Sequence, residues 1–221
     1  MIVDEISVKV VRKKVKRITL KIANATPLIT CPYEASEQYL IDFIRSKKSW
    51  ILKQLEKEKS RLKVTFCLND GEFVRLLSHK FCVKIIKSET EAIKLQGSAL
   101  IFFEKNSKNR EKVYKKWLNE QLEKVIEKLL ERWQPRMQVK CNGFEIKKVK
   151  SKWGWCNTKS GVLGFNLMLL FQNKDAIEYV VVHELAHLFE RGHNKKFYAI
   201  VSRFLPDYKK ADKSLMMPIE Q

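Results

Sequence analysis

An apolar stretch near the C-terminus, interrupted by two histidines and a glutamate, constrains this chain more than any other feature. It reads Val180-Val-Val-His-Glu-Leu-Ala-His187 and contains neither proline nor glycine. Residues four apart lie on one face of an α-helix, so the pattern predicts a buried helix that presents His183 and His187 together. Burying two imidazoles there is costly unless a partner or a metal ion satisfies them.

The same residues form an HExxH motif, the spacing with which a helix offers two imidazole nitrogens to one zinc ion. Glu184 follows the first histidine, where its carboxylate can take a proton from a metal-bound water. We therefore predict that His183 and His187 bind one Zn2+ ion as cofactor and that Glu184 is the catalytic base. HExxH fixes only three positions, so satisfied core histidines are the alternative, but a chance match would usually lie on a polar face.

A third ligand is expected from His193, which completes the pattern HExxHxxxxxH. In metzincin peptidases a glycine three residues after the second histidine bends the chain, and Glu190 stands there instead. We expect Gly192 to supply a left-handed residue that turns the backbone. A carboxylate from Glu190 or Asp207 is the alternative ligand. Either set leaves one position open for water, as a catalytic zinc requires.

Five stretches of the C-terminal half share a further pattern with a known family. They are Lys150-Ser-Lys-Trp-Gly-Trp-Cys156, Gly164-Phe-Asn-Leu167, Ile177-Glu-Tyr-Val-Val-Val-His-Glu-Leu-Ala-His187, His193-Asn-Lys-Lys-Phe197 and Leu205-Pro-Asp-Tyr208. Earlier matches are Arg17-Ile-Thr-Leu-Lys-Ile22, Pro27 and Lys48-Ser-Trp-Ile51. The chain thereby resembles the YgjP-like metallopeptidases, relatives of the SprT-type and WLM-type zinc peptidases. The resemblance implies His183, His187 and His193 as zinc ligands and Glu184 as general base.

Two positions depart from the family pattern. The family usually reads Trp-Gly-Ser-Cys where this chain has Trp153-Gly-Trp-Cys156, and it often has Ser where this chain has Asn194. Trp155 places an indole where the family has a small hydroxyl, close to the expected substrate groove. We expect this change to affect substrate preference and not metal binding.

The chain as a whole indicates an α+β fold in two parts. Residues 1–105 are predicted to be a β-rich N-terminal domain with one helix, which Ser36 caps and which runs through Leu55. Residues 106–221 are predicted to be a zincin-like metallopeptidase domain, opened by a long amphipathic helix that Pro135 stops. Two strands (Phe144 to Trp155, Val162 to Leu170), the HExxH helix capped by Asn173, and a closing helix (Lys195 to Leu205) follow.

Peptide recognition is expected at the edge of the sheet beside the HExxH helix. Residues 162–167 are our candidate for a strand that pairs with an extended peptide. Lys152 and Asn166 are candidate donors to a developing oxyanion, although a structural or surface role is the simpler interpretation of each.

Composition sets broader limits on location and partners. The 221 residues include 44 Lys and Arg against 25 Asp and Glu, a formal net charge of +19 that attracts polyanions, including nucleic acid. Five cysteines without a CxxC pair favour a reduced, cytoplasmic setting. No apolar stretch is long enough for a membrane span, and the N-terminus does not resemble a secretory signal.

Three functions are compatible with these residues. The favoured one is a zinc metallopeptidase that acts on peptide or protein substrates. A metal-dependent phosphohydrolase of anionic nucleotides is the second, because an activated water can attack phosphorus and the positive charge would attract the substrate. A nucleic-acid module with a structural zinc is the third, although a structural site has no use for the glutamate beside its ligand.

Overall fold

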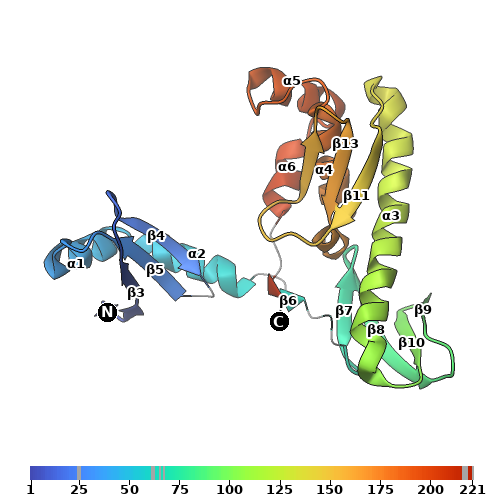
Figure 1. The fold of residues 1–221 in the computed structure, drawn as a ribbon, viewed down its shortest axis with the longest axis horizontal. Coiled ribbons are helices and arrows are strands. Elements are labelled where there is room, and N and C mark those ends of the chain that lie inside the picture. The colour runs from blue at the N-terminus through green and yellow to red at the C-terminus, as the bar shows by residue number, and fades with distance from the viewer. Residues whose placement is uncertain (24–25, 61–62, 65, 67, 216–218, 221) are drawn as a thin grey trace. The chain divides into compact units, whose positions relative to one another are not determined.

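The structure is a computed structural model that describes residues 1–23, 26–60, 63–64, 66, 68–215 and 219–220, with backbone alone at 57–60, 63–64 and 219–220. The chain forms two compact units, residues 1–61 and 62–221. Each unit has its own hydrophobic cluster. The predicted α+β class is confirmed, since helices and sheets occur in both units (Figure 1).

The first unit combines a three-stranded sheet with two helices. Its strands pair in the order β3-β5-β4, and a two-stranded ribbon, β1-β2, precedes them. The predicted single helix is broken at Lys47, while Ser36 caps it as predicted by accepting from Tyr39 N at 3.2 Å. The elements are β1 Ile2–Val3, β2 Ile6–Ser7, β3 Lys9–Arg12, β4 Thr19–Ala23, β5 Thr26–Cys31, α1 Glu37–Ser46 and α2 Lys48–Ser60.

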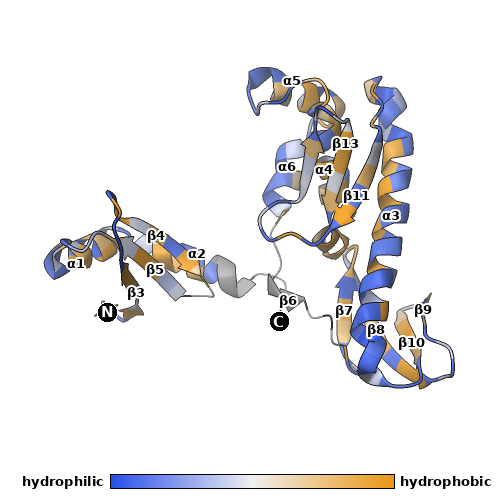
Figure 2. Cartoon of the chain, in the orientation of Figure 1, coloured by the Kyte–Doolittle hydropathy of each residue, from blue (hydrophilic) through white to orange (hydrophobic). Residues whose placement is uncertain are grey.

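The second unit begins with a four-stranded sheet and a long helix. Its strands pair in the order β7-β8-β10-β9, and the helix α3 carries alternating apolar and polar stripes (Figure 2). A short parallel pair, β6 Lys63–Val64 with β14 Ile219–Glu220, belongs to the same unit. The other elements are β7 Phe73–Leu76, β8 His79–Lys87, β9 Ala92–Gln96, β10 Ala99–Glu104, the 3-10 turn η1 Ser107–Asn109 and α3 Arg110–Met137.

The predicted division between residues 105 and 106 falls inside this second unit. Phe102 of β10 and Tyr114 of α3 share one hydrophobic cluster, with their ring centroids 5.5 Å apart. Arg110 pairs with Glu104 and also donates to the carbonyl of Leu68 at 2.7 Å. The four-stranded sheet therefore packs as part of the same unit as α3, and the observed division lies near residue 61.

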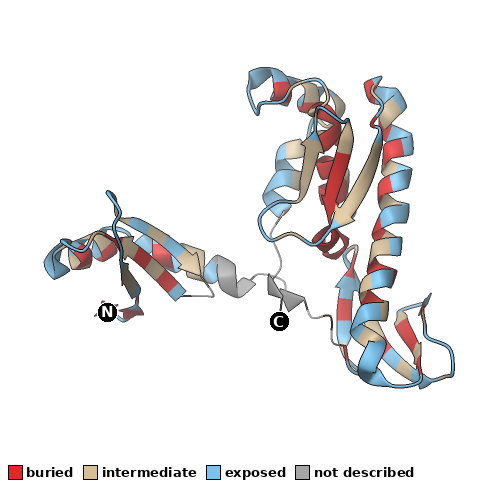
Figure 3. Cartoon of the chain, in the orientation of Figure 1, coloured by how far each residue is buried: buried red, intermediate tan, exposed pale blue. Residues whose placement is uncertain are grey.

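A second sheet and three helices form the remainder of this unit. The sheet has the order β11-β13-β12, with β13 parallel to β11 and antiparallel to β12. β13 is buried whereas its two neighbours are partly exposed (Figure 3). The elements are β11 Gly143–Lys147, β12 Gly154–Asn157, β13 Val162–Asn166, the 3-10 turn η2 Leu167–Phe171, α4 Lys174–Ala186, α5 Lys195–Phe204 and α6 Tyr208–Ser214.

Three local predictions in this region were wrong. The stretch from Phe144 to Trp155 is two strands, β11 and β12, which do not pair with each other. The strand that starts at Val162 ends at Asn166, because the chain continues as η2. Pro135 lies inside α3, which runs on to Met137 and ends at Gln138 in the left-handed conformation.

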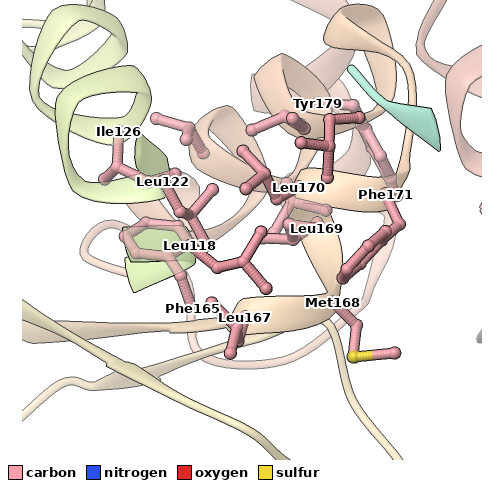
Figure 4. Packing of buried hydrophobic residues seen from close by; sticks show 14 of the residues in the cluster. Leu118, Leu122, Ile126, Phe165, Leu167, Met168, Leu169, Leu170, Phe171 and Tyr179 are labelled. Carbon is pink, nitrogen blue, oxygen red and sulfur yellow. The ribbon is translucent and has the colours of Figure 1, made fainter. Parts of the chain in front are cut away.

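The core of the second unit fixes α4 in place. Leu118, Leu122 and Ile126 of α3 pack beside Leu169 and Leu170 of η2 (Figure 4). Phe165 of β13 and Tyr179 of α4 belong to the same cluster. Contact on several sides explains why α4 is apolar almost all round. Among the described residues, no helix is both long and apolar enough to span a membrane.

Candidate metal centre

The HExxH residues lie in the last turns of α4. Asn173 caps the helix as predicted, because its side chain accepts from Ala176 N at 2.7 Å. His183 and His187 are half-buried on one face of the helix, and Glu184 is buried. The apolar residues between them belong to the core, so packing holds the two imidazoles in place.

The structure brings the three predicted histidine ligands together. One ring nitrogen from each of His183, His187 and His193 lies within 4.8 Å of the others. The Nε2 atoms of His183 and His193 are 2.9 Å apart. Three imidazoles converging on one point form a donor set suited to a tetrahedral zinc with one position left for water.

Neither carboxylate considered as an alternative ligand joins this group in the described part of the chain. Glu190 contacts the histidine cluster through its main chain, because its carbonyl oxygen lies 3.1 Å from His187 Nδ1. Its carboxylate accepts from Gly192 N at 3.3 Å. The Asp207 side chain is 84% exposed and pairs with Lys210 at 3.2 Å.

The turn that returns His193 is built differently from our expectation. Gly192 does not have a positive φ, so it is not the left-handed residue that was predicted. Glu190 N donates to the carbonyl of Ala186 at 3.1 Å, and Asn194 N donates to that of Gly192 at 2.9 Å. Asn194 then caps α5 by accepting from Phe197 N at 3.1 Å. Because Ser and Asn are both good N-caps, this departure from the family pattern preserves the cap.

Phe197 of α5 forms an apolar base beneath the three histidines. It is fully buried, and its ring centroid lies 4.8 Å from that of His183, 4.5 Å from that of His187 and 4.9 Å from that of His193. Such a base excludes water from one side of the imidazoles and limits their rotation.

Hydrogen bonds at the far ring nitrogens favour metal binding through Nε2. The carbonyl of Glu190 can only accept, so the proton of His187 lies on Nδ1 and the lone pair lies on Nε2. Burial, followed by the neighbouring imidazoles, lowers the pKa of His183 to about 3. Burial also lowers the pKa of His187. Both rings are therefore neutral at physiological pH, as metal ligands must be.

Glu184 lies between the histidines and the sheet with an unsatisfied oxygen. The residue is 5% exposed, and among the described atoms its buried Oε2 has no hydrogen-bond partner. Burial raises the pKa of Glu184 to about 8, while the charge of Lys152 acts in the opposite direction. Buried polar atoms are nearly always bonded, so an unpartnered carboxylate beside three imidazoles fits a site that holds a cation and a water.

The sheet strand nearest Glu184 is β12, not β13. Residues 162–167, our predicted substrate edge, lie in β13 and the start of η2, and β13 is the central strand with both edges paired. Among the strands that the structure describes, β12 has one partner, and a Cβ on its Gly154 would lie 2.6 Å from Glu184 Oε1. The free edge of β12 therefore runs beside the candidate base.

Trp155 points away from this site, contrary to our expectation. Successive strand residues face opposite sides of a sheet, so Gly154 faces Glu184 and Trp155 faces the other side. Its indole covers Gly164 of β13 and lies near the carboxylate of Glu145 of β11. Where the family usually has a small hydroxyl side chain, Trp155 therefore makes a packing contact on the outer face of the sheet.

The two candidate oxyanion donors lie in different surroundings. Asn166 is fully buried and donates to the carbonyls of Val149 and Lys152 at 2.8 and 2.7 Å, which is a structural role. Lys152 is exposed, and its ammonium lies 4.5 Å from the centroid of the Trp155 ring. Neither contact assigns an oxyanion donor.

Sequence reasoning missed two neighbours of the centre. Tyr179 lies one helical turn before His183, and its hydroxyl is 3.3 Å from His183 Nδ1. The spacing of four residues on a helix was a usable signal for this contact. Gly154 borders Glu184 across a tertiary contact, for which the local sequence holds no signal.

Comparison with known proteins extends these observations. A family model described as YgjP-like, metallopeptidase domain, matches residues 16–217. Two similar solved structures are the metallopeptidase zymogens abylysin of Pyrococcus abyssi and jannalysin of Methanocaldococcus jannaschii. Their identities to this chain are 22% and 18%, and their TM-scores are 0.38 and 0.36. Each match covers 40% of this chain, and 89% and 90% of the respective relative.

Likeness at these TM-scores carries no functional conclusion. No curated protein shows a significant match to the chain. The family match, in contrast, spans most of the sequence and confirms the resemblance seen in its motifs. The chain therefore belongs to the YgjP-like metallopeptidase family, and it is a metal-dependent hydrolase of peptide bonds.

Proposed function

We propose that this protein is a zinc metallopeptidase in which His183, His187 and His193 hold a single Zn2+ ion and Glu184 is the general base. The observation that carries the proposal is the convergence of three imidazole nitrogens within 4.8 Å, beside a buried carboxylate oxygen without a partner. Imidazole ligands suit zinc, and the open fourth position is typical of a catalytic site rather than a structural one.

A bound zinc ion in such a set supplies an activated water near neutral pH and polarises the scissile carbonyl. Glu184 removes a proton from the attacking water and delivers it to the leaving nitrogen. Its burial keeps the carboxylate out of bulk water, and the adjacent Gly154 leaves space for it. Phe197 keeps the histidine rings in place while this occurs.

The substrate is proposed to bind as an extended peptide along the free edge of β12. An unpaired strand edge offers alternating main-chain donors and acceptors to a peptide of any sequence. Gly154 at the start of this strand contacts the candidate base, so a peptide paired there passes close to the metal ligands. Main-chain pairing predicts weak sequence preference.

The alternative functions gain no support from the family match. The net charge of +19 suggested nucleotides or nucleic acid as partners, but the matched family is a peptidase family. A cytoplasmic setting remains our prediction. It agrees with the four cysteines that the structure describes, which are free, while Cys67 lies outside the described residues.

The test compares the wild-type protein with Glu184→Gln and His183→Ala. Zinc content is measured by elemental analysis, and hydrolysis is measured on an unfolded polypeptide and on nucleoside triphosphates, with and without chelator. Glu184→Gln is expected to retain zinc and to lose about 10²- to 10⁴-fold in hydrolysis, as loss of a general base does. His183→Ala is expected to lose both. A fully active Glu184→Gln enzyme would contradict the proposal.

A further inference from the structure

Tyr179 contacts the candidate ligand His183 from behind. The two residues lie one turn apart on α4, and the tyrosine is 4% exposed. Its hydroxyl oxygen is 3.3 Å from His183 Nδ1, and the two rings meet edge to face at 5.5 Å between centroids. This contact lies on the side of the imidazole opposite the Nε2 atom that faces His193.

The carboxylate of Asp212 of α6 lies close enough to the same hydroxyl to act on it electrostatically. A carboxylate can only accept, so Asp212 favours an orientation in which the single hydroxyl proton of Tyr179 is directed toward it. In that orientation the hydroxyl oxygen accepts from His183, with the ring proton on Nδ1. This leaves the lone pair of His183 on Nε2, where the three histidines converge.

Stacked rings hold the tyrosine in this position. Tyr208 of α6 stacks on Tyr179 with centroids 6.1 Å apart and an interplanar angle of 21°. Tyr198 of α5 also stacks on Tyr208, with centroids 5.8 Å apart and an interplanar angle of 19°. Tyr208 and Asp212 lie on the same helix, so packing of α6 against α4 positions both the stacked ring and the nearby carboxylate.

We propose that Asp212 and Tyr179 are positioning residues that fix the tautomer and orientation of His183 and thereby raise the affinity of the site for its metal ion. The relay runs from the carboxylate through the phenol to the imidazole. It has the role of the carboxylate that commonly bonds a metal-binding histidine directly, with a tyrosine inserted between the two groups. The inference rests on the proposed function, because it takes His183 to be a metal ligand.

The size of the effect follows from the role of such outer partners. Removing a group that bonds the far nitrogen of a metal-binding histidine costs about 10- to 100-fold in metal affinity. Tyr179→Phe keeps the ring and its stacking and removes only the hydroxyl. Asp212→Asn keeps a hydrogen-bonding side chain but removes the charge, so a smaller loss in the same direction is expected.

Zinc affinity is the readout, measured by competition with a chromophoric chelator on the full-length protein. The variants are Tyr179→Phe, Asp212→Asn, their combination and the control Tyr114→Phe. Tyr114 is also a fully buried tyrosine, but its hydroxyl has no partner among the described residues and it lies in the core with Phe102. Thermal unfolding of the metal-free proteins by circular dichroism checks that each variant is folded.

We expect Tyr179→Phe to weaken zinc binding about 10- to 100-fold and Tyr114→Phe to leave it within about twofold. The combined variant should bind zinc no more weakly than Tyr179→Phe, because both changes interrupt one relay. Asp212 is exposed, so Asp212→Asn provides a folded variant even if Tyr179→Phe is unstable.

Each contrary outcome has a distinct meaning. Wild-type zinc affinity in both Tyr179→Phe and Asp212→Asn would overturn the relay, as would fully additive losses in their combination. Equal affinity of the wild-type protein and His183→Ala would overturn the ligand assignment and the relay with it. A wild-type protein that binds zinc through His183 and cleaves no peptide would overturn the proposed function alone, and the relay would stand on the affinities.

Discussion

The substitution Gly154→Ala tests the position of the candidate base more directly than removal of the base itself. Gly154 is not in the left-handed region, so alanine introduces no backbone strain there. The new methyl group would lie 2.6 Å from Glu184 Oε1, 2.8 Å from its Cγ and 2.9 Å from its Cδ. All three atoms belong to one side chain, which must therefore move.

The expected displacement follows from ordinary contact distances. Non-bonded carbon atoms prefer about 3.5–4.0 Å, so a carboxylate carbon now at 2.9 Å has to retreat by about 1 Å. Misplacing a reacting group by this distance costs about 100-fold in rate. Overpacking of this kind also destabilises the fold by about 1–3 kcal/mol. The histidines are not touched, so zinc affinity should stay within about twofold of the wild-type value.

The assay measures kcat on an unfolded polypeptide at saturating zinc, alongside zinc affinity. Gly192→Ala is the matched control, because a Cβ there meets its nearest neighbour, Asn194 Nδ2, at 3.8 Å although the residue adjoins a candidate ligand. We expect the control to retain wild-type kcat. Full activity in Gly154→Ala, in a protein that unfolds at lower temperature than wild type, would show that the rate does not depend on this position of Glu184.

Three further predictions concern stability. Because the pKa of Glu184 is raised to about 8, the folded metal-free protein holds a proton that the unfolded chain has released. The free energy of unfolding should therefore fall by about 2 kcal/mol from pH 6.5 to 8. Urea titrations should show this decline in the wild-type protein and not in Glu184→Gln. Gly164→Ala should lower the free energy of unfolding by about 1–3 kcal/mol, because its Cβ would lie 1.8 Å from the Trp155 indole. The loss should be much smaller in a Trp155→Ser background, and equal losses in both backgrounds would contradict the packing account. Asn173→Ala should cost about 1 kcal/mol through loss of the α4 cap, measured by thermal unfolding.

Local signals predicted the helical half of the site well. The HExxH helix, its cap at Asn173 and the following helix with Phe197 depend on spacing and capping within a few residues. These patterns act within one or two turns, so they can be read without knowing the fold. The position of His193 beside the other two histidines was predicted by the same kind of reasoning. Only the backbone conformation of the turn before it differs from the prediction.

Non-local pairing limited the prediction of the sheet. The order β11-β13-β12 places two strands that are successive in sequence on opposite edges. Sequence reasoning joined them into one strand, and it then took β13 as an edge. The residues between β11 and β12 contain no turn that would bring them together as a hairpin. The predicted domain boundary differs from the observed division for a related reason. Phe102 and Tyr114 lie on either side of the predicted boundary, and their rings pack together in the structure.

The position of Trp155 shows that knowledge of strand pairing would have improved the prediction of the site. Alternation allows only one of Gly154 and Trp155 to face α4, but it does not say which one. Pairing resolves the choice, because Trp155 lies opposite Gly164, whose missing side chain provides room for the indole. A bulky residue and a glycine on neighbouring strands form a complementary pair. With Trp155 packed on the outer face, Gly154 faces inward, and the absence of a side chain there is what allows Glu184 to lie against the strand.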